Sequence, residues 1–154
     1  MAYRLSELLR PERIALGVQV RDKSDLFQEI AALAHRALPG VGSQEVREAL
    51  EERERLATTA IGDGIAVPHA KVKAVTELAA LLVTAPEGVD FGAPDGRKVE
   101  IVLALLAPPA AGDPLKALAK MSRVLRDGGF RRKLLAAAAG PDVWDLVKSH
   151  EASR

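Results

Sequence analysis

The amino-acid sequence predicts an α/β fold in which a mixed β-sheet is flanked by helices. Near both ends of the chain, apolar residues recur every three or four positions, which is typical of amphipathic helices. In the middle, residues 78–84 and 99–106 form two largely apolar runs, which are typical of strands covered on both faces. Because strands lie in the middle of the sequence and helices at both ends, we expect the helices to pack on the faces of one sheet.

The first element expected is a short strand, because apolar residues alternate with others between residues 14 and 20. A helix should follow, since the apolar residues between 26 and 37 share one helical face. Asp22 or Ser24 can cap its N-terminus, and the Pro-Gly pair at residues 39–40 is expected to end it.

A second helix is expected to begin at Ser43 and to bury a stripe that contains Val46 and Leu50. Beyond this helix the pattern changes, because residues 58–70 are rich in glycine and otherwise β-like. Further on, the Pro-Asp-Gly sequence at residues 94–96 predicts a turn. We therefore expect the segments on either side of that turn to pair as a hairpin.

The C-terminal third is expected to be helical. Asp113 is a suitable N-cap, and Pro114 suits the first helical position. A glycine pair at residues 128–129 divides the apolar pattern, and a last helix is expected to begin near Pro141.

Length and composition restrict the class of protein. The 154 residues fit a single domain, which we expect to span residues 1–154. Lys and Arg number 22 against 21 Asp and Glu, so there is no broad positive field and nucleic acid is not an expected partner. The chain has no cysteine, which removes disulfides and thiol chemistry. No apolar run approaches the roughly 20 residues that span a bilayer, and no signal-peptide core is recognisable, so we expect a cytoplasmic protein without stable membrane insertion.

The three histidines differ in their placement. His35 lies within the first predicted helix and His150 in an expected frayed tail, so we expect structural or solvated roles for both. His69 follows Pro68 in a β-like stretch, and the proline stiffens the backbone that carries it. Its imidazole offers a nitrogen lone pair at cellular pH, which suits a covalent acceptor. The alternative is a histidine at a strand end that only bonds to a nearby carbonyl.

Metal binding at His69 is not expected. No second histidine lies three or four residues away, and no cysteine exists to complete a site. The residues also indicate no requirement for another cofactor.

Arg53 lies where the apolar stripe of the second helix would continue after Val46 and Leu50. A helix rarely turns an arginine inward without a partner. The guanidinium could reach toward His69 and grip a phosphate, a role that suits arginine. Alternatively, it could form a structural ion pair with Glu54.

Hydroxyls and glycine amides between Arg53 and His69 can line an anion pocket. We single out Thr58, Thr59 and Gly64 as candidate phosphate-pocket residues. The Gly-Asp-Gly sequence at residues 62–64 is by itself only a turn signal and lacks the lysine of a nucleotide-binding loop.

Taken together, Arg53-Glu54 and the run from Thr58 to His69 resemble the signature of the fructose- and mannitol-type IIA family of the bacterial sugar phosphotransferase system. The family pattern is an Arg-Glu pair, then Ser/Thr-Thr-Gly-hydrophobic-Gly, then Gly-Ile-Ala-Ile-Pro-His. Nitrogen-regulatory members share this signature, and the spacing from arginine to histidine is kept. The resemblance extends across most of the chain and implies a mixed sheet between helices.

The resemblance implies that His69 accepts a phosphoryl group, through Nε2, from a phosphocarrier resembling HPr. It also implies that Arg53 stabilises the phosphate, which would make the chain a phosphotransferase of the relay type. IIB domains of these systems carry phosphate on cysteine, which this chain lacks. It would therefore donate to a separate IIB protein or act on regulatory targets, such as sensor kinases or potassium transport components. Its length favours the regulator.

Two positions depart from the family pattern. Ala60 replaces a common glycine, and Pro114 lies where many members have a second histidine that assists the phosphorylated site. Lys116 is the nearest cation to that position in the sequence. Two alternatives therefore remain beside the phosphorylated regulator. One is a binding module with a vestigial, weakly phosphorylated or unphosphorylated site, and the other is a soluble IIA component of a sugar transporter.

Overall fold

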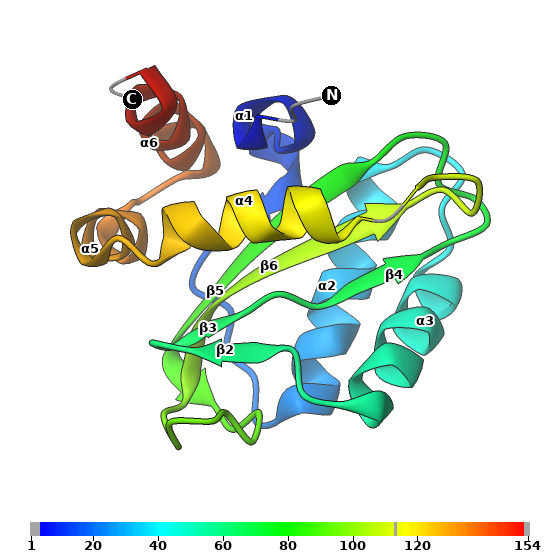
Figure 1. Ribbon diagram of the computed structural model, residues 1–154, viewed down its shortest axis with the longest axis horizontal. Coiled ribbons are helices and arrows are strands. Elements are labelled where there is room, and N and C mark those ends of the chain that lie inside the picture. The colour runs from blue at the N-terminus through cyan, green and yellow to red at the C-terminus, as the bar shows by residue number, and fades with distance from the viewer. Residues whose placement is uncertain (1–3, 113, 153–154) are drawn as a thin grey trace.

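A mixed sheet of six strands, with helices on both of its faces, organises the computed structural model, which describes residues 4–112 and 114–152 (Figure 1). The predicted α/β class is therefore confirmed. The strands are β1 (Ile14–Ala15), β2 (Ala60–Gly62), β3 (Ile65–Ala66), β4 (His69–Lys71), β5 (Ala79–Val89) and β6 (Val99–Ala107). The helices are α1 (Leu5–Leu8), the 3₁₀ turn η1 (Pro11–Arg13), α2 (Lys23–Ala37), α3 (Ser43–Leu56), α4 (Leu115–Leu125), α5 (Gly128–Ala136) and α6 (Gly140–Ala152).

The central pair of the sheet is the antiparallel hairpin of β5 and β6, in the strand order β1-β5-β6-β3-β2. On its other edge β6 pairs in parallel first with β3 and then with β4. Ile65 is opposite Ile101, and His69 is opposite Leu105. The central strand therefore places the segment that carries His69.

Alternate residues of the hairpin face two separate apolar layers, as expected for a sheet covered on both sides. Leu81 and Val83 face the layer formed with α2 and α3. Leu82 and Leu103 face the layer formed with α1, α4, α5 and α6. Figure 1 shows α2 and α3 behind the sheet and α4 in front of it. The apolar runs predicted as doubly covered strands thus have that environment.

Several predicted elements are confirmed. The helix α2 is capped by Asp22, whose carboxylate accepts from the Asp25 amide at 2.8 Å, and α3 begins at Ser43. The predicted hairpin also forms, with Val89 opposite Val99. The C-terminal helices are separated near the glycine pair, where Asp127 caps α5. The predicted cap at Asp113 lies outside the described residues.

The predicted strand over residues 14–20 is much shorter in the structure, which has only β1 there. Gly17 has φ +68°, so it turns the chain out of the extended conformation. The amides of Gly17 and Val18 then donate to the hydroxyl and carbonyl of Thr84 at 2.9 Å each. Alternation alone could not reveal this turn.

The expectation of a frayed tail around His150 is wrong. His150 lies within α6, and its ring meets Phe130 of α5 edge-on with centroids 5.1 Å apart. The contact arises because α5 and α6 pack together, which local spacing does not show. A structural or solvated role was expected for His35, which is exposed, with Nδ1 3.0 Å from the Val41 carbonyl oxygen.

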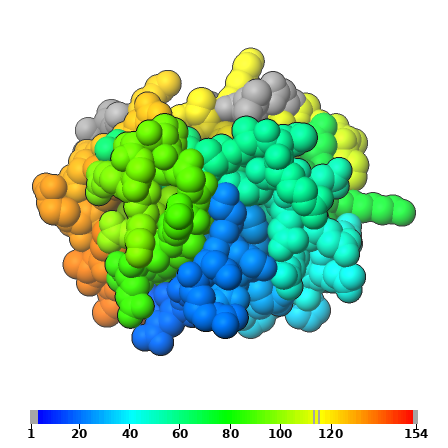
Figure 2. All heavy atoms as spheres, turned by 90° about the horizontal axis from the view of Figure 1, so that it is seen from below, coloured from blue at the N-terminus to red at the C-terminus, as the bar shows by residue number. Residues whose placement is uncertain are grey.

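The turn between β2 and β3 is held by the loop that joins β5 to β6. Its three residues Gly62, Asp63 and Gly64 all have positive φ. The Asp63 amide donates to the Asp95 carboxylate at 2.9 Å, and Figure 2 shows these two segments side by side on the lower face. This contact fixes the entry to β3 and, beyond it, to His69.

In the part of the chain that the structure describes, no helix combines the length and apolarity that a membrane crossing requires.

Candidate functional site

Backbone pairing with the central strand β6 holds His69 at the start of β4. The preceding carbonyl, that of Pro68, accepts from the Leu105 amide at 2.9 Å, and His69 itself pairs with Leu105 of β6. Pro68 is buried and His69 is half-buried. The stiff presentation expected from the Pro68-His69 sequence therefore has a physical basis in the pairing with the central strand.

The ring of His69 has one nitrogen engaged. Nδ1 lies 3.1 Å from the Val67 carbonyl oxygen. Because a carbonyl oxygen only accepts, this bond assigns the proton to Nδ1 and leaves the lone pair on Nε2. The bond to a nearby carbonyl, which the sequence left as the alternative to chemistry, is therefore present in the structure, and it leaves a lone pair on Nε2.

An open hollow of about 570 Å³ lies beside His69. The end of α3, strand β4 and the approach to α4 contribute its walls. Its lining residues are Ala49, Glu52, Arg53, Leu56, His69, Ala70, Lys71 and Pro114. The structure therefore brings together the two residues, His69 and Arg53, for which sequence and resemblance predicted a shared site.

Arg53 is half-buried at the end of α3, where its Nη1 donates to the Ala57 carbonyl at 3.0 Å. Within the described residues Arg53 is in no ion pair. The Glu54 carboxylate, with only 6% of its side chain exposed, lies 2.8 Å from Lys23 Nζ instead. The alternative of an Arg53–Glu54 ion pair is therefore wrong, because Glu54 turns inward to α2.

Thr58, Thr59 and Gly64 do not line the hollow of His69 in the structure. The Thr58 hydroxyl donates to the Phe91 carbonyl at 2.9 Å, and the Thr59 hydroxyl donates to Glu54 at 2.6 Å. The Gly64 carbonyl accepts from the amides of Glu100 and Ile101. All three positions thus hold the scaffold around β2 and β3, and their role in binding phosphate stays a prediction.

Glu54 is the centre of the network that fixes the end of α3. It accepts from Lys23 Nζ and from both the amide and the hydroxyl of Thr59, which is itself 4% exposed. Lys23 also donates to the Phe91 carbonyl at 3.0 Å. Three segments far apart in the sequence are thereby joined at the end of α3.

We expect Glu54→Ala to lower the free energy of unfolding by about 2 kcal/mol. Removal takes the carboxylate partner from the Lys23 charge, which keeps only its bond to the Phe91 carbonyl, and leaves the Thr59 amide without its acceptor, which together cost more than one ordinary hydrogen bond. The loss stays below that of a fully buried ion pair because the Lys23 side chain is 29% exposed. Chemical denaturation would measure it.

The matched control is Glu51→Ala, one turn earlier on α3. Glu51 forms an ion pair with Arg47 at 2.9 Å on a more exposed surface, so its loss should cost about 0.5 kcal/mol or less. Equal losses in the two variants would show that the Glu54 network adds no stability beyond a surface ion pair.

Sequence reasoning did not assign to the site five residues that line the hollow, namely Ala49, Glu52, Leu56, Ala70 and Lys71. Leu56 is 80% exposed at the last position of α3. A signal for Lys71 existed, because it follows His69 by two residues in a strand and so shares its face. Pro114 was noted for its type, but only the structure shows that it lies beside His69 in the same hollow.

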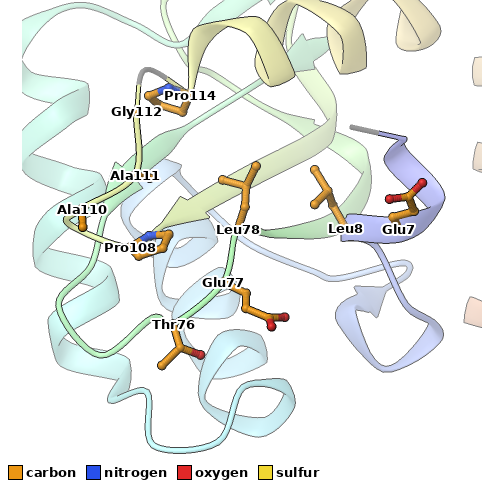
Figure 3. Close-up of a pocket in the computed structure, with 10 residues that line it drawn as sticks. All are labelled: Glu7, Leu8, Thr76, Glu77, Leu78, Pro108, Ala110, Ala111, Gly112 and Pro114. Atoms are coloured by element: carbon orange, nitrogen blue, oxygen red, sulfur yellow. The ribbon is translucent and has the colours of Figure 1, made fainter. Parts of the chain in front are cut away.

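A second hollow of about 630 Å³ lies next to the first and shares Pro114 with it (Figure 3). Its walls come from α1, from residues 76–78 and from the segment 108–112. Among its described lining residues the titratable groups are the carboxylates of Glu7 and Glu77, and the others are mostly apolar. Neither His69 nor Arg53 lines this second hollow.

Within residues 4–112 and 114–152, no group of three or more histidine, aspartate or glutamate side chains is arranged to hold a metal ion.

Comparisons with known proteins agree with this geometry. The profile of the family described as phosphoenolpyruvate-dependent sugar phosphotransferase system, EIIA 2, matches residues 7–150. A nitrogen regulatory protein of Bradyrhizobium diazoefficiens is 38% identical over 93% of this chain and 94% of its own length. The crystal structure of the nitrogen regulatory protein IIA-Ntr from Neisseria meningitidis has a TM-score of 0.83 and 30% identity, over 92% of this chain and 97% of that one.

The third comparison concerns the fold alone. A complex of enzyme IIA and phosphorylated enzyme IIB for mannitol from Escherichia coli matches with a TM-score of 0.77 and 23% identity. The match covers 95% of this chain and 98% of the chain in that complex.

Proposed function

Because this chain belongs to the EIIA 2 family of the phosphoenolpyruvate-dependent sugar phosphotransferase system, we propose that it receives a phosphoryl group on His69 from a phosphocarrier resembling HPr. The observation that carries the proposal is the bond from Nδ1 of His69 to the Val67 carbonyl, which leaves Nε2 as the nucleophile beside a hollow that Arg53 also lines.

The transfer joins Nε2 of His69 to phosphorus while the bond between phosphorus and the donor nitrogen breaks. The electron pair of that bond returns to the donor imidazole. Nδ1 of His69 keeps its proton and its bond to Val67 throughout, so the ring does not need to reorient. Such a reaction depends mainly on positioning and on charge stabilisation of the equatorial oxygens, which we assign to Arg53.

We further propose that the phosphorylated and unphosphorylated forms act as a regulator or relay in the cytoplasm. Likeness to nitrogen regulatory proteins of nearly the same length favours regulation of target proteins. Donation to a separate IIB protein is the second candidate, and the fold shared with the IIA chain of the mannitol complex favours it. A binding module with a vestigial site is the third, and the presence of Pro114 in the hollow favours it.

Leu56 is proposed as a docking contact for the donor protein. A donor must approach His69 across the open hollow, and Leu56 presents an 80% exposed side chain on its rim. Contiguous apolar surface beside a site marks protein interfaces, and Leu56 shares the lining of the hollow with Ala49 and Ala70. We expect Leu56→Ser to raise the KM for the phosphorylated carrier about five- to tenfold, a loss typical of one apolar contact.

The same variant should leave stability unchanged, because an exposed side chain contributes little to folding. Steady-state transfer kinetics, with Arg97→Ser outside the hollow as the control, would measure the effect. A KM for Leu56→Ser equal to that of the control would remove Leu56 from the docking surface.

The experiment that tests the proposed function is incubation of the protein with phosphorylated HPr-like carrier, followed by mass spectrometry of the intact chain. Gain of one phosphoryl group, labile to acid and stable to base as expected for a phosphohistidine, would support the relay. If the chain gains no phosphoryl group while a known IIA protein in the same mixture does, the site is vestigial and the binding module is the correct function.

A further inference from the structure

We propose that Lys71 supplies a second positive charge to the phosphoryl group on His69, at a site where Pro114 leaves no second histidine. This inference rests on the proposed function and adds a phosphate-contacting residue to it.

Lys71 and His69 share one face of β4. They lie two residues apart in a strand that pairs with β6 over its whole length, with His69 opposite Leu105 and Lys71 opposite Ala107. Side chains two residues apart in a strand point to the same side. Both residues line the hollow that Arg53 also lines, so the ammonium and the imidazole open onto the same space.

The charge of Lys71 is available to a ligand. Its Nζ donates to the Ala111 carbonyl at 3.2 Å, and among the described residues it is in no ion pair. An ammonium has three donors, so two remain after this bond. A bond from the ammonium to a phosphoryl oxygen is favoured over the exposed bond to a neutral carbonyl, because the negative charge of the phosphoryl group adds a Coulomb attraction that the carbonyl lacks.

The hollow needs this charge. A phosphoryl group brings roughly 1.5 to 2 negative charges at neutral pH. Among the described lining residues there are two cations, Arg53 and Lys71, and one anion, Glu52, which offsets part of the field of Arg53. Pro114 offers neither a charge nor an N–H donor. Lys71 is thus the cation that can balance the second charge of the phosphoryl group.

The Ala111 carbonyl, to which the Lys71 ammonium donates, lies where it can direct that charge toward the phosphoryl group. Ala111 belongs to the segment that leads from β6 to Pro114. Its carbonyl holds the ammonium beside the place where α4 begins, and Pro114 lines the hollow at that place. Lys71 thereby provides, from β4, a cation at the side of the site where α4 begins. Without Lys71, a residue of α4 would have to supply that charge.

The test compares Lys71→Met, Lys71→Arg and the matched control Lys116→Met, whose lysine is exposed on α4 but does not line the hollow. Transfer from phosphorylated HPr-like carrier and the lifetime of the phosphohistidine are measured for each. We expect Lys71→Met to slow transfer about tenfold and to shorten the lifetime, since exposed cations contribute less than a buried oxyanion donor. Lys71→Arg and Lys116→Met should stay within about twofold of wild type. Thermal unfolding should be unchanged, because Lys71 is exposed.

A second measurement separates this inference from the proposed function. Inorganic phosphate is titrated into the unphosphorylated wild type and Lys71→Met, and the His69 ring resonances are followed by NMR. Weaker phosphate binding in Lys71→Met supports the inference even if no carrier transfers to the wild type, a result that would overturn only the proposed function. Coinciding titration curves, or a Lys71→Met transfer rate equal to that of Lys116→Met, would overturn the role of Lys71.

Discussion

Replacement of His69 by alanine is expected to abolish phosphoryl uptake from phosphorylated carrier. The variant lacks the Nε2 nucleophile, and no neighbouring lining residue offers an equivalent nitrogen. The fold should survive, because the half-buried ring makes one hydrogen bond, to Val67, whose loss costs about 1 kcal/mol. Mass spectrometry of the intact chain after incubation would show the loss of uptake, and circular dichroism would show the retained fold.

His35→Gln is the control for histidine content. His35 is exposed on α2, where its Nδ1 bonds to the Val41 carbonyl, so its replacement should change stability little and leave the capacity for phosphorylation intact. Persisting phosphate on the His69→Ala chain would refute His69 as the acceptor. Loss of uptake in both variants, in proportion to the fraction that is unfolded, would point to a general requirement for the fold rather than to an acceptor.

Replacement of Arg53 by alanine is expected to slow transfer to His69 about 100-fold, which is the lower end of the cost of removing one oxyanion donor. Arg53→Lys should slow it about tenfold, because lysine keeps the charge but loses the planar fork that grips two oxygens. We expect these effects because Arg53 and His69 line one hollow. Among the described residues, Arg53 is in no ion pair that would occupy its charge. Rapid-quench measurements of single-turnover transfer would determine both rates.

Arg53 also has a structural contact, and the experiment separates the two roles. Its bond to the Ala57 carbonyl ends α3, so Arg53→Ala should lower the free energy of unfolding by about 1 kcal/mol. Arg55→Ala, on an exposed neighbour outside the hollow, is the control for charge. If Arg53→Lys unfolds the protein while the folded fraction transfers at the wild-type rate, Arg53 only holds the end of α3, and the assignment to phosphate is refuted.

Much of the fold was predictable because the responsible forces act over short stretches of chain. The helices α2 and α3 follow from three- and four-residue apolar spacing, and Asp22 caps α2 as its position suggested. The hairpin of β5 and β6 follows from two apolar runs around a Pro-Asp-Gly turn. Two predictions were wrong because residues distant in the sequence make the decisive contacts. The first predicted strand ends early at Gly17, whose amide donates to Thr84, and the tail expected to fray is a helix in which His150 packs on Phe130.

The site was predictable in its residues but not in its arrangement. The sequence by itself singled out His69 behind Pro68, and Arg53 at the end of an apolar stripe, because side-chain chemistry and spacing are properties of the chain. Only the tertiary structure assigned Glu54 to Lys23 rather than to Arg53, and Nδ1 of His69 to the Val67 carbonyl.

The charges of the hollow were likewise predictable in type but not in arrangement. The sequence by itself determined that position 114 carries a proline and therefore no imidazole to contact a phosphoryl group. Only the tertiary structure put Pro114 and Lys71 beside His69, with Lys71 bonded to Ala111. The physical reason is that these neighbours are brought together by the parallel pairing of β4 with β6 and by the path of the chain from β6 into α4. Strand spacing could have put Lys71 on the face of His69, but the bond from Lys71 to Ala111 and the shared hollow depend on how the whole sheet and its helices pack, which local spacing does not show.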